Sequence, residues 1–234
     1  MKLVVDYIFD VDGTLTRSRC RIDKEFGVWF SKFCERSNVY LVTGSDRSKT
    51  IEQVGEFIYH SCKRVYNCSG NDVYKGDENL YTLDWKLPDL SRNFLQNCQY
   101  ESKFSIRTGN HIEERPGMVN FSVLGRNAST QERASYISYD TKENERSTIA
   151  NAFNIMFPEL HATVGGDIGI DIAPRGCDKS QILRDFKDST QLRFYGDKCE
   201  EGGNDYSISQ AISKRNNSQV YNVRDWIETW NLLK

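Results

Sequence analysis

The chain has 234 residues, enough for one large domain or two smaller ones. Its formal net charge at pH 7 is −2, so charge gives no reason to expect nucleic acid or a membrane surface as a partner. No apolar stretch is long enough to cross a membrane, and the first residues lack the apolar centre of a secretory signal. The 7 cysteines form no C-x-x-C pair, which argues against a disulfide framework or a zinc site. We therefore expect a folded protein of the reducing cytoplasm.

The first part of the sequence alternates strands with helices. A buried strand is predicted at Leu3 to Phe9, and Asp23 can cap a helix that carries aromatic residues on one face. The next predicted elements are a strand at 39–42, a helix at 48–59, a strand at 64–67 and a short strand at 73–74. Such alternation predicts a mostly parallel sheet covered by helices, with ligands beyond the carboxyl ends of its strands.

The pattern changes after about Gly76. Short strands with Gly and Pro between them are predicted in meander order, and Ser129 with Glu132 forms a capping box that begins a helix. The predicted elements here are strands at 103–107, 111–114, 118–123, 160–164 and 168–172, and a longer helix at 142–157. We interpret residues 82–174 as an inserted α+β cap domain with an antiparallel sheet.

Strand–helix alternation then resumes. The predicted elements are a helix at 178–186, a strand at 192–195, a helix after Gly203, a strand at 219–221 and a closing helix from Asp225. The fold class is therefore α/β. Residues 1–81 and 175–234 together form one core with a parallel sheet, which the cap domain interrupts.

Two acids follow the first predicted strand, in the segment FDVDGTLT. Because side chains alternate along a strand, Asp10 and Asp12 can point the same way while Val11 turns into the core. Two carboxylates so close together favour a cation or a proton between them. A calcium loop that starts at Asp10 would need Gly and Glu where Leu15 and Arg21 stand, so that reading fails. We prefer a catalytic Mg²⁺ site to a surface turn.

Other polar residues follow later strands of the predicted core. The hydroxyl of Thr43 could hold a phosphate oxygen, with Ser45 close behind it, and Lys179 could neutralise a phosphoryl charge. Asp10, Asp197 and the backbone carbonyl of Asp12 could supply oxygen ligands to Mg²⁺. Taken singly, Thr43 fits an ordinary turn residue and Lys179 a solvated lysine. Together these features predict phosphoryl transfer to a carboxylate nucleophile.

These motifs carry a family resemblance. The chain resembles phosphotransferases of the haloacid dehalogenase superfamily with an α/β cap of the C2, type IIB kind. Within that superfamily it is similar to the eukaryotic-type phosphomannomutases. The matching segments are FDVDGTLT, TGSD, IEERPGMVNFSVLGRNASTQER, GGDIGIDIAPRGCDKSQIL and FYGDKCEEGGNDYSI. The resemblance implies a Rossmann-like core with a parallel sheet and an inserted cap.

The resemblance also implies roles for the matching residues of the core. Asp10 would be the nucleophile that becomes an aspartyl phosphate, and Asp12 the general acid and base. Asp10, Asp12 and Asp197 would hold Mg²⁺. The remaining implied roles are phosphate binding by Thr43, Ser45 and Lys179, and support of the metal by Asn204 and Asp205.

Further implied residues would bind the substrate. They are Arg19, Arg115, Arg126, Arg133, Gly169 and Asp171. Without the resemblance, the arginines of the cap fit surface residues as well as a phosphate site. Gly169 stands where the family usually has serine, Thr43 stands where many mutases have glycine, and residues 206–212 lack an acid that the family uses for a second cation.

We expect an enzyme that interconverts mannose 6-phosphate and mannose 1-phosphate, primed by a hexose 1,6-bisphosphate, and a homodimer formed through the cap. Two alternatives stay open. Thr43 and Gly169 also fit a Mg²⁺-dependent sugar-phosphate phosphatase without mutase activity. The other alternative is an inactive scaffold that acts through protein contacts.

Overall fold

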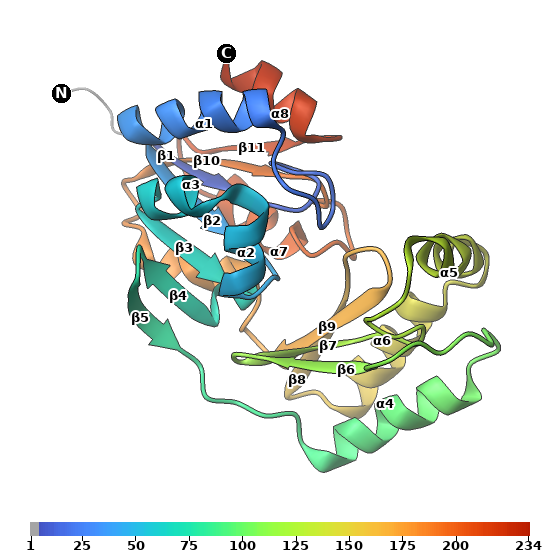
Figure 1. Cartoon of the computed structure of the whole chain (residues 1–234). Helices are drawn as coiled ribbons and strands as arrows, with labels where there is room; N and C mark the ends of the chain where they lie inside the picture. Colours follow the sequence, from blue (N-terminus) through green and yellow to red (C-terminus); the bar gives the residue numbers. More distant parts are fainter. Residues whose placement is uncertain (1–4) are drawn as a thin grey trace. The chain divides into compact units, whose positions relative to one another are not determined.

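The structure is a computed structural model that describes residues 5–234, so Leu3 and Val4 of the first predicted strand lie outside the described residues. The chain divides into two compact units. The core unit combines the chain up to Leu83 with Cys177–Lys234, and the cap unit is Asp84–Gly176 (Figure 1). No helix among residues 5–234 is both long and apolar enough to span a bilayer.

The core unit is built on a 7-stranded sheet in the order β11-β10-β1-β2-β3-β4-β5. All pairs from β11 to β3 are parallel, and β4 and β5 add an antiparallel hairpin at one edge. This confirms the α/β class with a largely parallel sheet. The strands are β1 (Val5–Phe9), β2 (Asn38–Val42), β3 (Arg64–Asn67), β4 (Asp72–Lys75), β5 (Glu78–Thr82), β10 (Gln191–Gly196) and β11 (Gln219–Asn222).

Helices cover both faces of this sheet because neighbouring residues of each strand point to opposite sides. Phe9 packs with α1 and α8, which lie together in Figure 1, whereas Ile8 packs with α7 and η2 on the other face. The helices of the core unit are α1 (Lys24–Arg36), α2 (Arg47–Val54), α3 (Glu56–Ser61), α7 (Tyr206–Ser213) and α8 (Trp226–Leu233), with the 3₁₀ helices η1 (Cys68–Gly70) and η2 (Lys179–Asp185).

Helix ends in the core unit follow the predicted caps, with two differences. The side chain of Asp23 accepts hydrogen bonds from the first turn of α1, as expected, and that of Asp225 caps α8, where the closing helix was predicted to begin. The helix predicted at 48–59 is split because Gly55 adopts a φ of 85°, which ends α2 and starts α3. The helix predicted at 178–186 winds instead as the 3₁₀ helix η2, whose first turn is capped by Asp178.

The cap unit contains a 4-stranded sheet in the order β6-β7-β9-β8, in which every pair is antiparallel. This agrees with the predicted α+β character. Phe153, Tyr136 and Leu95 bring three helices into the apolar core beside the sheet. The elements are α4 (Asp89–Glu101), β6 (Ile112–Arg115), β7 (Met118–Phe121), α5 (Thr130–Glu143), α6 (Glu145–Met156), β8 (Leu160–Gly165) and β9 (Gly169–Pro174).

Three features of the cap unit differ from the sequence prediction. Helix α4 was not predicted. The strand predicted at 103–107 is absent from the described chain, and the Arg107 guanidinium donates to the backbone carbonyls of Phe104 and Ile106 in this segment. The helix predicted at 142–157 begins only at Glu145, because Asn144 adopts a left-handed φ of 54° between α5 and α6.

Candidate active site

Polar side chains of the core unit meet where adjacent parallel strands end. Asp10 follows β1, Thr43 follows β2 and Asp197 follows β10, and these strands are neighbours in the sheet. The backbone N–H of Asp10 donates to the carbonyl of Tyr195, and that of Thr43 to the carbonyl of Tyr66, both at 2.9 Å. Parallel strands end at the same edge of a sheet, so residues distant in the sequence come together here.

The loop after β1 turns sharply and packs against the end of β10. The backbone N–H groups of Leu15 and Thr16 both donate to the carbonyl of Val11 at 3.0 Å. Gly13 adopts a φ of 83°, and a Cβ atom at this position would lie 2.3 Å from Oδ2 of Asp197. Only glycine therefore allows the loop to approach Asp197 so closely.

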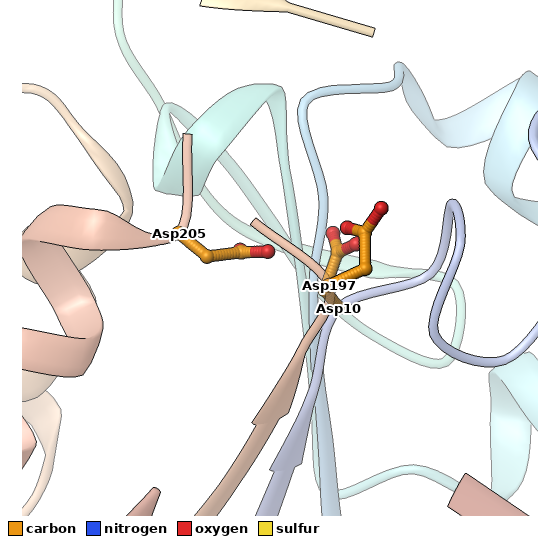
Figure 2. A group of neighbouring side chains, drawn as sticks. All are labelled: Asp10, Asp197 and Asp205. Carbon is orange, nitrogen blue, oxygen red and sulfur yellow. The ribbon is translucent and has the colours of Figure 1, made fainter. Parts of the chain in front are cut away.

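Three carboxylates converge at this edge of the sheet. One oxygen each from Asp10, Asp197 and Asp205 lies within 4.8 Å of the others. Figure 2 shows Asp10 and Asp197 next to each other at the strand ends, with Asp205 directed toward them from the start of α7. Asp10 is 2% exposed and Asp205 is 0% exposed. Carboxylates buried this close together require positive charge or a proton.

Lys179 supplies part of that positive charge. Its Nζ lies 2.6 Å from Oδ1 of Asp10 and 2.7 Å from Oδ1 of Asp205. Burial by itself would lower the pKa of Lys179, but the two carboxylates outweigh burial and raise the pKa above its ordinary value. Lys179 is the first residue of η2 and is therefore a buried cation in a fixed position.

The site still carries an excess of negative charge. Burial raises the pKa of Asp10 well above its ordinary value although Lys179 opposes the shift, and burial with the nearby Asp205 raises the pKa of Asp197 to about 6. The Oδ1 atom of Asn204 is buried and has no hydrogen-bond partner among residues 5–234. A group of oxygen ligands with uncompensated charge fits a hard divalent cation.

The composition of this group differs from the expected ligand set. The sequence placed Asp205 in a supporting role, but its carboxylate belongs to the group itself. The carboxylate of Asp12 is not part of the group. Sequence reasoning had expected Asp12 to offer its backbone carbonyl.

Asp12 is held separately from Asp10. Its Oδ1 accepts hydrogen bonds from the backbone N–H of Arg19 at 2.7 Å and from Nε2 of Gln53 at 2.9 Å. Its Oδ2 accepts a long hydrogen bond of 3.5 Å from the hydroxyl of Ser45. Arg19 has a left-handed φ of 59° and is exposed. Its contact with Asp12 is made by the backbone N–H. The two aspartates of the motif therefore have different environments.

The loop that carries Thr43 and Ser45 is held by its neighbour in the sheet. The carbonyl of Thr43 accepts from the N–H of Ser69 at 2.8 Å, and that of Ser45 accepts from the N–H of Cys68 at 2.9 Å. Cys68 and Ser69 both have left-handed φ values, 49° and 59°. The hydroxyl of Thr43 accepts from the N–H of Ser45 at 3.1 Å, which gives this buried threonine a structural contact.

The cap unit gathers the other predicted arginines. Arg115 and Arg126 both pair with Glu113, and Arg133 on α5 donates to the backbone carbonyls of Ala128 and Arg126 at 3.0 and 2.7 Å. Burial by itself would raise the pKa of Glu113, but the two arginines outweigh burial and lower it to about 2. Burial and the charge of Arg126 lower the pKa of Arg133. This concentration of guanidinium groups suits a phosphate.

Asp171 and Gly169 belong to a polar corner of the cap sheet. Asp171 on β9 lies opposite Asn120 on β7, and Nδ2 of Asn120 donates to Oδ1 of Asp171 at 2.6 Å. A Cβ atom at Gly169 would lie 2.7 Å from the Asn120 amide, and one at Gly165 would lie 2.2 Å from the Asp171 carboxylate. The glycines leave room for this pair, which gives a physical reason for Gly169 where the family usually has serine.

Sequence reasoning missed three residues that contact the predicted ones. Gln53 binds Asp12, Glu113 binds Arg115 and Arg126, and Asn120 binds Asp171. For Glu113 the sequence offered one indication of this contact. Side chains alternate along a strand, so Glu113, two residues before Arg115, shares its face of β6. A glutamine within a helix carries no comparable signal.

The fold of the chain is similar to that of haloacid dehalogenase-like hydrolases. A solved haloacid dehalogenase-like hydrolase from Bacteroides thetaiotaomicron superposes with a TM-score of 0.57, covering 100% of both chains at 13% sequence identity, and that likeness shows the fold alone. The structural class agrees with the predicted superfamily.

Sequence comparison gives the particular family. Residues 27–231 match the family model for eukaryotic phosphomannomutase. The phosphomannomutase of Spinacia oleracea is 35% identical over 210 residues, which cover 86% of this chain and 84% of that protein. The phosphomannomutase of Saccharomyces cerevisiae is 34% identical over 212 residues, covering 86% and 83%. The chain belongs to the eukaryotic phosphomannomutase family, as its motifs predicted.

Proposed function

We propose that the protein is a Mg²⁺-dependent phosphomannomutase that interconverts mannose 6-phosphate and mannose 1-phosphate. The observation that carries this proposal is the contact of the buried Lys179 ammonium with Asp10, while Asp12 is bound elsewhere by Gln53. A carboxylate next to a fixed cation suits the nucleophile, and a second carboxylate in a separate environment suits the acid and base. The family of the chain supports the same assignment.

In the first half-reaction, a carboxylate oxygen of Asp10 attacks the phosphorus of a hexose 1,6-bisphosphate. The ester bond between phosphorus and the sugar oxygen breaks, and that oxygen takes a proton from Asp12. In the second half, the aspartyl phosphate passes its phosphoryl group to the free hydroxyl of a hexose monophosphate. The proton of that hydroxyl returns to Asp12, so both aspartates are regenerated.

The core residues stabilise the charges of this transfer. Asp10, Asp197 and Asp205, with the backbone carbonyl of Asp12 and support from Asn204, would hold Mg²⁺. The bound cation supplies positive charge that offsets the phosphoryl oxygens. Lys179 remains protonated beside Asp10 and contributes a second positive charge.

The mutase assignment, rather than simple hydrolysis, depends on the cap. A mutase must bind a second phosphate at the far end of the sugar. We assign that role to Arg115, Arg126 and Arg133, with Arg19 of the core unit as a further phosphate ligand. Asp171 and Asn120 would bind sugar hydroxyls, since they are paired polar groups in the same unit as the arginines.

The test is a direct assay of products. Purified protein with Mg²⁺, mannose 1-phosphate and glucose 1,6-bisphosphate is followed by ³¹P NMR, which separates the two hexose monophosphates from inorganic phosphate. We expect interconversion with little phosphate release, and loss of both in Asp10→Asn. Release without interconversion would establish the sugar-phosphate phosphatase that Thr43 and Gly169 favour. If Asp10→Asn leaves every measured activity unchanged, the result would favour the inactive scaffold.

Partner and compartment remain predictions. We propose a cytoplasmic homodimer joined through the cap, by analogy with the family. Sedimentation of the purified protein would measure the molecular mass in solution, and a monomer at micromolar concentration would contradict the dimer.

A further inference from the structure

Glu113 binds two arginines of the cap unit at the same time. Its Oε1 accepts from Nε of Arg115 at 2.8 Å and from Nη2 at 2.7 Å, and its Oε2 accepts from Nε of Arg126 at 2.8 Å. The side chains of Arg115 and Arg126 are only 9% and 11% exposed, and that of Glu113 is 29% exposed. The three groups therefore interact in a partly desolvated place, where electrostatic attraction is stronger than in water.

The backbone of the cap sheet brings the three residues together. Glu113 and Arg115 stand two apart on β6, so their side chains leave the same face of the strand. Arg126 comes from the segment between β7 and α5, and its N–H donates to the carbonyl of Asn110 at 2.7 Å, just before β6. The neighbouring Glu114 belongs to the other face of β6 and pairs with Arg92 of α4 instead.

Glu113 contacts the same part of both guanidinium groups. A guanidinium group has five N–H donors in a planar fork, and Glu113 occupies the Nε side of each group. Two guanidinium groups repel each other when they are brought close without an anion between them. A carboxylate that bridges the Nε sides offsets this repulsion and fixes the relative orientation of the two forks.

We propose that Glu113 is a positioning residue that holds Arg115 and Arg126 side by side, in the relative orientation in which the two guanidinium groups bind the phosphate of the hexose that is not being transferred. This inference rests on the proposed function for the identity of that phosphate ester. It assigns Glu113 no contact with substrate. Both the charge and the length of the side chain matter, because one carboxylate must reach two guanidinium groups.

Two substitutions separate length from charge. Glu113→Gln keeps the length but turns an N–H₂ donor toward one of the arginines, so only one guanidinium stays bound. Glu113→Asp keeps the charge but is one methylene shorter and reaches only one arginine. Glu114→Gln is the matched control, because it removes a carboxylate from the adjacent residue, which lies on the other face of β6 and pairs with Arg92.

The primary measurement follows the arginine side chains themselves. The ¹H–¹⁵N signals of the Nε groups of Arg115 and Arg126 are assigned by Arg→Lys substitutions and titrated with inorganic phosphate. We expect saturable shifts in the wild type and in Glu114→Gln. In Glu113→Gln and Glu113→Asp, half-saturation should require about tenfold more phosphate, the cost of one lost charge-assisted hydrogen bond.

A kinetic measurement accompanies the titration. For isomer interconversion, both Glu113 variants should raise KM for mannose 1-phosphate by about tenfold while kcat falls by less, because the lost interaction is a binding one. Circular dichroism in the near ultraviolet confirms that each variant folds. If one of the two Glu113 variants does not fold, the measurement is made on the other, since each of them breaks the contact of Glu113 with one of the two arginines.

The outcomes distinguish this inference from the proposed function. If the wild type responds to phosphate at both arginines and the Glu113 variants respond more weakly, the inference holds even when no interconversion is seen and the mutase proposal fails. If phosphate does not shift the wild-type signals, or if Glu113→Gln binds phosphate as tightly as the wild type or more tightly, the inference is wrong. In the last case Glu113 competes with phosphate for the arginines.

Discussion

The Nζ atom of Lys179 lies 2.6 Å from Oδ1 of Asp10, although 169 residues separate them in the sequence. A second carboxylate, that of Asp205, lies 2.7 Å from the same nitrogen, and all three side chains are buried. The lysine therefore stabilises two carboxylates that could not both be ionised in this place without it. Four predictions follow from this site and from the arginines of the cap.

Replacement of Lys179 by Met should destabilise the protein and stop phosphoryl transfer. Removing the cation leaves buried carboxylates unpaired, which costs about 3–5 kcal/mol in unfolding free energy. Urea unfolding of the metal-free protein measures this loss. Lys187→Met is the control, because Lys187 is exposed and its substitution should change stability by no more than about 0.5 kcal/mol. Equal stability of the two variants would contradict the structural role of Lys179.

Replacement of Gly13 by Ala should weaken Mg²⁺ binding. The added Cβ would lie 2.3 Å from Asp197, so this carboxylate must move away from position 13 and out of its place in the carboxylate group, at a cost of about tenfold or more in metal affinity. Calorimetric titration with MgCl₂ measures the affinity. Gly76→Ala is the matched control, since Gly76 also has a positive φ, 60°, but a Cβ atom there would lie 3.5 Å from the His60 ring, which is an ordinary contact distance. The control should lose some stability and keep its metal affinity.

The stabilisation of the protein by Mg²⁺ should increase with pH. The folded, metal-free protein holds a proton on Asp197 up to about pH 6, whereas the unfolded chain releases it near 3.8. The native state therefore binds more protons in this interval, so the metal-free protein loses stability as pH rises from about 4 through 6, by at most about 3 kcal/mol.

Under the proposed function, Mg²⁺ would bind the ionised carboxylates and offset this loss. The increase in melting temperature on adding MgCl₂ should be small at pH 5 and large at pH 7.5. In Asp197→Asn the metal-free protein should lose less stability over the same range. A pH-independent effect of Mg²⁺ in the wild type would show that the cation binds away from Asp197.

Replacement of Arg126 by Ala should weaken the binding of hexose phosphates and leave the core chemistry intact. Loss of charge-assisted hydrogen bonds to a phosphate costs about 1.5–3 kcal/mol. Calorimetry with mannose 6-phosphate measures the affinity, and the turnover of phenyl phosphate, which has no distal phosphate, should not change. Arg92→Ala is the control, because Arg92 pairs with Glu114 and not with Glu113. Unchanged affinity in Arg126→Ala would remove Arg126 from the distal site.

Much of the fold could be predicted from local patterns. The apolar strand before Asp10, the caps at Asp23 and Asp225, and the capping box at Ser129 depend on residues close together in the sequence, so each could be read directly. Prediction failed where a residue adopts a positive φ, as at Gly55 and Asn144, or where a side chain binds backbone carbonyls. Arg107 is an example of the second kind, because its side chain binds the carbonyls of Phe104 and Ile106, which lie in the predicted strand.

The sequence by itself determined the motif of Asp10 and Asp12 and the largely parallel sheet, because side-chain alternation, turn residues and motif spacing are local properties. Its matching segments carried the resemblance to the family. Only the tertiary structure decided which common residues act on that motif. Asp205 joins the carboxylate group, Gln53 binds Asp12, and Glu113 bridges two arginines. Aspartate, glutamine and glutamate occur on most protein surfaces, and their partners here are set by the packing of strands and loops far apart in the chain. Such pairings follow from three-dimensional proximity and leave no periodic trace in the sequence.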